Sequence, residues 1–305
     1  MRYGSVGAVI AADSKANAVP LLRVGSITIV QRIILTLQQA GVFPIVVVTE
    51  KDEVEVTHQV AQLGVVFIRN EQPSGQMFEA VKLGLEFLQG KCDKVVFTPV
   101  NAPMFSAYTL QRLLASDGQI VKPTYNGRGG HPIILKSEVL GKILSYEGSE
   151  GLRGALRACN VNMVAVSDPG ILMNVHNDAE LQEHLAEHNA TLLSPTVKLS
   201  INKETVFFNS RLKLLLFLIE DLHSARQACF HAGLAYQNAW NMINKLEEET
   251  GYAVVTRQRG GKNGGETCLT EKGKQLMYAF QQYEEEVNAF AQQRFDGLFR
   301  KSKLI

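Results

Sequence analysis

The chain has 305 residues and a net charge of +1, with 46% hydrophobic and 20% charged residues. This composition is typical of a soluble globular protein of one or two domains and excludes a disordered chain. Its longest apolar runs, 95–100 and 212–219, are much shorter than the roughly 18 to 20 residues that a membrane span requires. Because the N-terminus also lacks the pattern of a signal peptide, we expect a cytoplasmic protein.

The first 190 residues alternate short β-rich apolar runs with longer amphipathic segments, which is typical of βαβ units. Apolar residues recur at helical spacing from Val30 to Leu37 and from Val81 to Leu88. Strands are expected near residues 6–11, 44–49, 65–68, 94–99, 120–123 and 162–166. The sequence therefore predicts an α/β domain with a largely parallel sheet over residues 1–190.

The rhythm changes after the aperiodic stretch 190–195, so we place a second domain at residues 196–305. A small hairpin of 197–201 and 205–208 is expected first, then helices over 210–221, 224–231, 236–249 and 272–294. A glycine-rich basic turn at 259–265 is flanked by strand-like 254–257 and 267–269. Helix, short turn, helix and β-ribbon are the outline of a winged helix-turn-helix.

The charge is distributed unevenly between the two predicted domains. Split at Ser194, the chain carries 16 Lys and Arg against 18 Asp and Glu before this point, and 15 against 12 after it, giving −2 and +3. Residues 257–274 alone hold five basic and two acidic side chains. This local excess is compatible with a nucleic-acid partner but does not identify one.

Polar side chains of the second domain form a candidate DNA-binding surface. Gly233 is suited to the turn that precedes the helix beginning at Tyr236. The exposed face of this helix is rich in amide side chains, which can pair bidentately with adenine, and Trp240 is expected on its buried face. A small helical domain with a polar surface is the competing interpretation. The predicted DNA contacts are Arg226, Tyr236, Gln237, Asn238, Asn241, Lys245, Arg257, Arg259, Lys262 and Asn263.

Residues 196–295 resemble the DNA-binding half of ModE-type molybdate-dependent transcriptional regulators. The most specific stretches are 233–240 in the second helix, 260–265 in the wing and 269–273 at the start of the last helix. The resemblance implies a winged-helix homodimer on a palindromic site in double-stranded DNA. These regulators usually carry a C-terminal molybdate-binding module, which this sequence lacks, so we do not expect molybdate sensing of that kind.

Loops after the predicted strands of the first domain lie where nucleotides commonly bind in α/β sheets. The segments 98–103, 127–132 and 168–174, in this order, resemble MobA- and MocA-type nucleotidyltransferases of molybdenum cofactor synthesis, over about residues 5–188. The resemblance implies a Rossmann-like nucleotidyltransferase fold. It also implies a ligand pocket at Ala11, Ala12, Asp13, Lys15, Asn101, Arg128, His131 and Asn174.

The charged groups that such enzymes use are replaced in this chain. Val19 stands where active relatives have a loop lysine, and Asn101 and Asn174 stand at the family's metal-binding carboxylate positions. Because Mg²⁺ chemistry normally requires anionic oxygen, we expect no catalytic residues and an inactive transferase domain. Asp168 is expected mainly to shape the turn before Pro169.

No metal site is expected from the sequence. The four cysteines, Cys92, Cys159, Cys229 and Cys268, show no CxxC spacing and are expected to be reduced structural thiols. The histidines outside the pocket, His58, His176, His184, His188 and His223, show no ligand spacing and are expected at the solvated surface.

The leading hypothesis is a DNA-binding transcriptional regulator, linked to molybdenum cofactor or molybdate metabolism, whose degenerate nucleotidyltransferase-like domain senses a molybdopterin-type or nucleotide effector. The alternative is a bifunctional molybdopterin cytidylyl- or guanylyltransferase that uses CTP or GTP with magnesium and carries a DNA-binding domain. A third interpretation is a fusion in which the first domain binds nothing and only sets the geometry of the dimer.

Overall fold

The computed structural model describes residues 4–12, 19–50, 54–71, 77–175, 178–257 and 266–300. The chain divides into two compact units, Met1–Leu193 and Ser194–Ile305. Five of the predicted site residues, Asp13, Lys15, Arg259, Lys262 and Asn263, lie outside the described residues. None of the helices in the described ranges is long and apolar enough to cross a bilayer.

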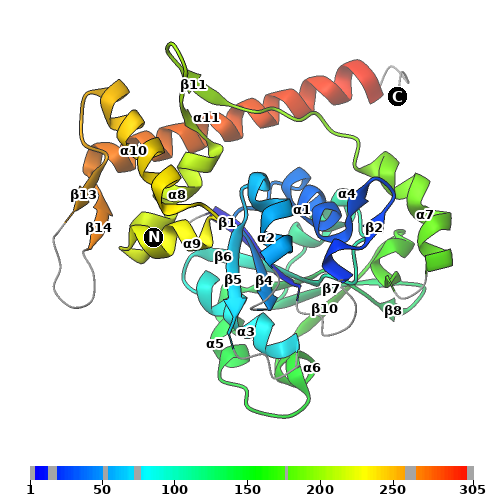
Figure 1. Ribbon diagram of the computed structural model, residues 1–305. Helices are drawn as coiled ribbons and strands as arrows, with labels where there is room; N and C mark the ends of the chain where they lie inside the picture. The colour runs from blue at the N-terminus through cyan, green and yellow to red at the C-terminus, as the bar shows by residue number, and fades with distance from the viewer. Residues whose placement is uncertain are drawn as a thin grey trace. The chain divides into compact units, whose positions relative to one another are not determined.

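The first unit is built on one mixed, mostly parallel sheet (Figure 1). Its strands are β1 (Gly4–Ala11), β4 (Ile45–Glu50), β5 (Val66–Asn70), β6 (Cys92–Pro99), β7 (Ile120–Tyr125), β9 (Ile133–Lys136) and β10 (Val161–Ala165), in the order β10-β7-β9-β6-β1-β4-β5. The short strand β8 (Arg128–Gly129) pairs with β7. The pairs β1–β4, β1–β6, β4–β5 and β7–β10 are parallel, whereas β9 runs antiparallel to both β6 and β7. The predicted Rossmann-like α/β fold is confirmed.

Helices cover both faces of this sheet because the side chains of its strands alternate in direction. Ala8 and Ile10 of β1 share a core with α1 (Ile29–Gln39), α2 (Val54–Val60) and α4 (Ala107–Leu114). Val9 points to the other face, where it contacts α3 (Met77–Leu88), and α5 (Ser137–Leu144) and α6 (Gly151–Leu156) pack beside that helix. Shorter elements complete the unit: η1 (Val19–Leu21), β2 (Arg23–Val24), β3 (Ile27–Thr28), η2 (Ala61–Leu63), η3 (Pro169–Leu172) and α7 (Asp178–Thr191).

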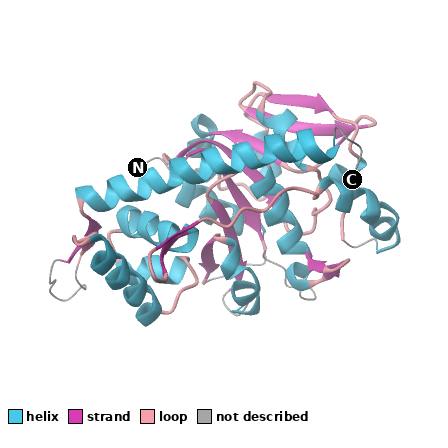
Figure 2. Cartoon of the chain, turned by 90° about the horizontal axis from the view of Figure 1, so that it is seen from above, coloured by secondary structure: helices cyan, strands magenta, loops and turns pink. Residues whose placement is uncertain are grey.

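The second unit has the element order expected for a winged helix-turn-helix. It contains β11 (Ser200–Asn202), β12 (Val206–Asn209), α8 (Ser210–Leu222), α9 (Ala225–His231), α10 (Tyr236–Thr250), β13 (Val255–Arg257), β14 (Thr267–Leu269) and α11 (Glu271–Phe295), followed by a π-helical turn, Asp296–Arg300. The apolar helix α8 is buried from Leu212 to Ile219, and Figure 2 shows α11 as one continuous helix. Phe208 and Phe280 pack edge to face, with ring centroids 4.6 Å apart, and join β12 to α11.

Strand β9 was not predicted from the sequence. Its apolar run, Ile133–Leu135, is short and directly follows the glycine-rich segment 127–132, so the sequence did not distinguish it from the preceding loop. In the structure this run fills the gap between β6 and β7 and is buried. Because β9 pairs antiparallel with both β6 and β7, the sheet is mixed rather than purely parallel.

Candidate functional site

A pocket of about 270 Å³ in the first unit brings together four of the predicted ligand-binding residues. Asn101, Arg128, His131 and Asn174 all line it, although they come from three separate segments of the sequence. Met77, Ala102 and Met173 are among the apolar residues at its wall. The segments that follow β6, β8 and η3 therefore line the same pocket.

Backbone hydrogen bonds hold the two asparagines in place. The residue before Asn101, Val100, donates its N–H to the Ala11 carbonyl at the end of β1, with an N···O distance of 3.0 Å. The Asn101 carbonyl accepts from the N–H of Val175 at 3.1 Å. The segment carrying Asn174 is therefore fastened to the end of β6.

His131 lies where the chain passes from β8 to β9, against the η3 turn. Its N–H donates to the Ile171 carbonyl at 3.0 Å, and its ring packs edge to face on Phe97 with centroids 5.8 Å apart. A Cβ on the preceding Gly130 would lie 2.1 Å from the Ile171 oxygen, so this close approach requires glycine.

Nδ1 of His131 is buried and has no hydrogen-bond partner among the described residues. Burial, and secondarily the positive charge of Lys122, lowers the pKa of His131 to about 4. The imidazole is therefore neutral near pH 7 and can exchange a hydrogen bond with a polar ligand group in the pocket.

The residues lining the pocket do not fit a magnesium ion. Among its described lining residues, Arg128 is the one charged side chain, His131 is neutral, and no carboxylate is present. Asn101 and Asn174 offer only amide oxygens, whereas magnesium sites normally include anionic oxygen. The arrangement suits a polar or anionic ligand bound by one guanidinium, two amides and an imidazole.

Ala11 and Ala12, predicted to belong to the pocket, do not line it. They are 1% and 0% exposed, and their backbone groups are taken up by the sheet. The Ala12 N–H donates to the Val48 carbonyl at 2.9 Å, and the Ala11 carbonyl accepts from Val100. The end of β1 therefore contributes to the pocket as a scaffold rather than as a contact surface.

Asp168 positions η3, whose residues Ile171 and Leu172 line the pocket. One carboxylate oxygen accepts from the Gly170 N–H at 2.9 Å. The other accepts from the Ser106 N–H at 2.9 Å and from the Thr109 hydroxyl at 2.7 Å. Both oxygens are thus used to join η3 to the start of α4.

His188 differs from the surface position expected for it, because it is 4% exposed. Its Nδ1 accepts from the buried Arg32 guanidinium at 2.9 Å, which leaves the proton on Nε2 to donate to the Phe105 carbonyl at 3.0 Å. Burial lowers the pKa of His188. Arg32 also donates to the Val24 carbonyl at 2.7 Å and to the Asn189 side chain at 2.9 Å, so one guanidinium anchors α7 on α1. Nothing in the local sequence pattern marked this pair.

In the second unit, the helix-turn-helix presents the predicted polar face of α10. Gly233 adopts φ 60°, and the next residue, Leu234, donates to the Cys229 carbonyl at 2.9 Å to close the turn. Tyr236, Gln237 and Asn238 are exposed in the first turn of α10. Asn241, one turn later, is also exposed and accepts a hydrogen bond from the Gln237 amide at 3.1 Å.

Arg257 of strand β13 lies against α10. Its guanidinium carbon is 3.9 Å from the centre of the Trp240 ring, and one of its nitrogens donates to the Asn244 side chain at 3.2 Å. Trp240, expected in the core, is only partly buried, and its ring contacts the Arg257 guanidinium and the Tyr236 ring. Asn244 was not predicted, although it follows Asn241 at helical spacing.

Lys245 and Arg226 occupy different environments. The Lys245 ammonium donates to the Thr205 hydroxyl, so it ties α10 to the β11–β12 hairpin. Arg226 is exposed in the first turn of α9. Of the predicted contact residues that the structure describes, Arg226, Tyr236, Gln237, Asn238, Asn241 and Arg257 are exposed, and Lys245 is half-buried.

Comparisons with known proteins show what the first unit is similar to. Residues 19–164 match the model of the MobA-like NTP transferase domain. A nucleotidyl transferase from Methanothermobacter thermautotrophicus superposes with a TM-score of 0.53 at 19% identity, covering 60% of this chain and 98% of that one. Rv0371c from Mycobacterium tuberculosis gives a TM-score of 0.50 at 18% identity, with coverages of 60% and 99%. The nucleotidyltransferase-like fold is thereby established.

The chain is also similar to ModE regulators, over a shorter length. The DNA-binding transcriptional dual regulator ModE of Escherichia coli is 35% identical over 57 residues, which are 19% of this chain and 22% of that protein. The transcriptional regulator ModE of Haemophilus influenzae is 29% identical over 85 residues, 28% and 32% of the two chains. The matches thus span between a fifth and a third of these relatives. The chain combines a MobA-like domain with a ModE-like region.

Proposed function

We propose that the protein is a DNA-binding transcriptional regulator, linked to molybdenum cofactor or molybdate metabolism, in which the MobA-like domain is a ligand-sensing module. The observation that carries this proposal is a contrast between the units. The exposed polar face of α10 is flanked by a positioned arginine, whereas the pocket of the first unit has no carboxylate among its described lining residues.

The DNA-binding part of the proposal rests on α10 and β13. Gln237 and Asn241 lie one helical turn apart on an exposed face and are side chains of the type that reads adenine in a major groove. Arg257 adds a cation next to this face that can contact a phosphate. The α10 face would read bases, and the wing strand would position the helix on the backbone.

A homodimer is part of the same proposal, since a palindromic site requires two copies. The first half of α11 packs on its own unit through Met277 and Phe280, which are 0% and 2% exposed. Further along, Tyr283 is 50% and Phe290 63% exposed. A second copy of the chain packing against this part of α11 would cover these aromatic side chains.

The pocket at His131 is the proposed effector site. The guanidinium, the two amides and the neutral imidazole among its described lining residues are suited to a molybdopterin-type or nucleotide ligand with an anionic group. An effector regulates only if the DNA-competent and DNA-incompetent states of the dimer bind it with different affinities.

The alternative of an active cytidylyl- or guanylyltransferase requires magnesium-dependent release of pyrophosphate from CTP or GTP. The lack of a carboxylate among the described residues that line the pocket argues against this reaction. Full-length protein incubated with molybdopterin, magnesium and either nucleotide is expected to release no pyrophosphate above the rate without protein. Steady turnover would overturn the sensor assignment.

The DNA-binding proposal is tested with the full chain and a pool of random duplexes. After rounds of selection, we expect a palindromic sequence that binds the dimer, with an affinity that falls steeply as salt rises. Selected duplexes without a shared palindrome, or binding that is independent of salt, would contradict the proposal.

A further inference from the structure

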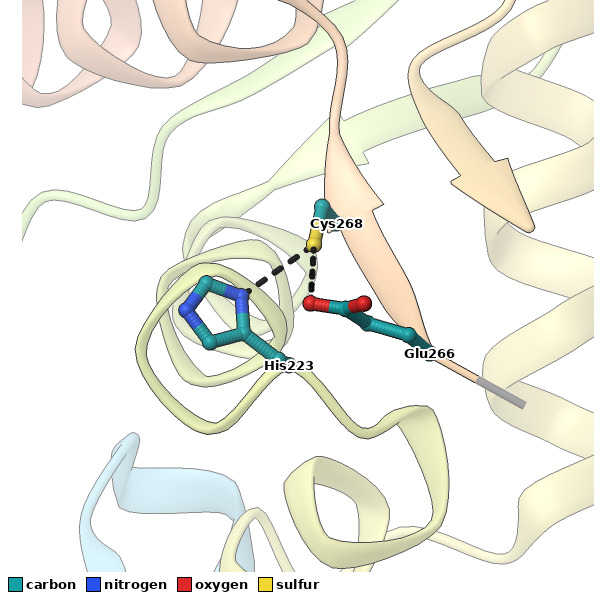
Figure 3. Close-up of side chains that lie close together, drawn as sticks. All are labelled: His223, Glu266 and Cys268. Atoms are coloured by element: carbon teal, nitrogen blue, oxygen red, sulfur yellow. Dashed lines mark hydrogen bonds between the residues drawn. The ribbon is translucent and has the colours of Figure 1, made fainter. Parts of the chain in front are cut away.

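Three side chains with metal-binding chemistry meet at the base of the wing in the second unit. His223 ends α8, while Glu266 and Cys268 flank the first residue of β14, and Figure 3 shows their side chains turned toward one another with the sulfur next to both partners. The His223 Nδ1 is 3.1 Å from the Cys268 sulfur, and this sulfur is 3.6 Å from a Glu266 carboxylate oxygen. All three ligand atoms lie within 4.8 Å of one another.

These separations are close to those of a zinc-type centre. With a Zn–S bond of about 2.3 Å and Zn–N and Zn–O bonds of about 2.0 to 2.2 Å, tetrahedral geometry places neighbouring donor atoms about 3.5 Å apart. Thiolate, imidazole and carboxylate are also the donor types that zinc prefers. A deprotonated Cys268 and Glu266 would together neutralise a divalent ion, so its charge is balanced without another acidic group.

The backbone around the cluster holds the donors near one another. The N–H of Thr267, which lies between Glu266 and Cys268, donates to the His223 carbonyl at 3.0 Å. On the other side of Cys268, the Leu269 N–H donates to the Glu220 carboxylate at 3.2 Å. Strand β14 is thus fixed to the end of α8 on both sides of the cysteine.

The backbone conformation of His223 also helps to orient its ring. His223 has φ 51° in the left-handed region, and its N–H donates to the Ile219 carbonyl at 2.9 Å as the cap of α8. A residue other than glycine in this conformation is uncommon. The imidazole is therefore held at the helix end rather than on a freely moving loop.

We propose that His223, Glu266 and Cys268 form a binding site for one divalent transition-metal ion of the zinc type, with solvent as the fourth ligand. His223 and Glu266 are exposed and Cys268 is half-buried, so the ion reaches the site directly from solvent. An open, three-ligand site exchanges its ion more readily than a closed four-ligand structural site. The site therefore responds to metal availability.

The cysteine is less suited to act alone as a redox sensor. Burial, followed by the negative charge of Glu266, raises the pKa of the Cys268 thiol, and Lys274, which pairs with Glu220 at 2.7 Å, opposes this effect only in part. Reactive redox cysteines have the opposite property, a lowered pKa that favours the thiolate.

Cobalt(II) titration of the reduced full-length protein tests the site, because Co²⁺ takes the same ligands as zinc and reports a thiolate ligand through a charge-transfer band. We expect one Co²⁺ per chain, a thiolate-to-cobalt band, and displacement of the cobalt by zinc. Cys268→Ser should abolish the band, and Cys159→Ser, which changes a half-buried cysteine of the first unit, should retain it. Absence of the band in the parent protein, or its persistence in Cys268→Ser, would overturn the site.

His223→Gly provides a second variant that keeps the fold. Glycine adopts the left-handed conformation without strain, so the cap of α8 survives while the imidazole is removed. We expect this variant to retain the circular dichroism of the parent protein and to lose cobalt affinity at least tenfold. Unchanged affinity would exclude His223 as a ligand.

An effect of the metal on DNA rests on the proposed function and is measured separately. Since the ion would join α8 to the strand that follows the wing, zinc is expected to tighten binding to a selected duplex severalfold in the parent protein and not in Cys268→Ser. Cobalt uptake without any such change supports the site and overturns the coupling. Lack of DNA binding at any zinc concentration would contradict the proposed function, not the metal site.

Discussion

The Arg257 guanidinium lies 3.9 Å from the centre of the Trp240 ring, which links the first strand of the wing to the helix that carries the proposed base-reading side chains. A second contact, from Arg257 to the Asn244 side chain at 3.2 Å, fixes the direction of the guanidinium fork. These two contacts hold the exposed arginine against α10, so under the proposed function it is already in place before DNA binds. Less side-chain entropy is then lost on binding.

Replacing Arg257 tests this arrangement. Arg257→Ala is expected to weaken binding to all duplexes alike and to reduce the salt dependence by about one phosphate contact. Arg257→Lys should keep the salt slope but lose affinity, because an ammonium cannot stack on the indole and donate to Asn244 with the same geometry. Fluorescence anisotropy over a series of salt concentrations measures both quantities. Arg153→Ala, an exposed arginine of the first unit, is the control and should leave the slope unchanged.

Replacing Gln237 tests base reading by α10. Gln237→Ala is expected to reduce discrimination at one base pair of the selected site by about 1 to 3 kcal/mol, while binding to unrelated DNA changes little. Affinities for the selected duplex and for its single-base variants supply the measurement. A uniform loss of affinity across all variants would instead mean that Gln237 contacts the DNA backbone.

The sequence was sufficient to predict most strands of the first unit and the helices α8 to α11, because these elements follow simple periodicities, but it did not predict β9. Strand β4 is a run of β-branched residues from Ile45 to Thr49, and the apolar residues of α1 recur at helical spacing. The resemblance to nucleotidyltransferases predicted that Asn101, His131 and Asn174 share a pocket, and all three line one pocket in the structure.

Contacts between residues that lie far apart in the sequence could not be predicted, because no local sequence pattern indicates them. His223 and Cys268 are 45 positions apart, and only the pairing of β14 with the end of α8 brings them together. Trp240 appeared apolar enough for the core, but the sequence contains no signal that Arg257 would cover its ring. The buried pair of Arg32 and His188 is separated by an even longer stretch of chain.

The stability of the first unit is expected to depend on pH through His131. Its folded pKa of about 4 lies below the usual value of 6.5, so between these values the unfolded chain binds a proton that the folded chain excludes. Stability is therefore fully present above about pH 6.5 and falls as the pH is lowered toward 4, by about 2 kcal/mol between pH 8 and pH 5.

Urea unfolding at pH 8 and pH 5 measures this contribution when His131→Gln is compared with the parent protein. The variant should lose about 2 kcal/mol less than the parent on acidification, whereas the contribution of His188, whose pKa is also lowered, remains in both proteins. The same loss in parent and variant would show that His131 is accessible to protons in the folded state.

Two helical glycines of the first unit are expected to respond in opposite ways to the same substitution. Gly84 of α3 faces the central strand, and a Cβ there would lie 2.5 Å from a methyl carbon of Val9, which is completely buried. Gly141 of α5 is exposed, and the atom nearest to an added Cβ is the Gln89 side-chain nitrogen at 4.0 Å. Only the second position has room for a methyl group.

Gly84→Ala is therefore expected to destabilise the unit by about 1 to 3 kcal/mol through overpacking between α3 and β1. Gly141→Ala should stabilise it by up to about 1 kcal/mol because alanine has the higher helix propensity. Midpoints of urea unfolding at an unchanged denaturant slope give both values. Because the intrinsic helix preference is the same at the two sites, a difference in sign isolates the contact with Val9. If Gly84→Ala were as stabilising as Gly141→Ala, α3 could not lie as close to β1 as the structure has it.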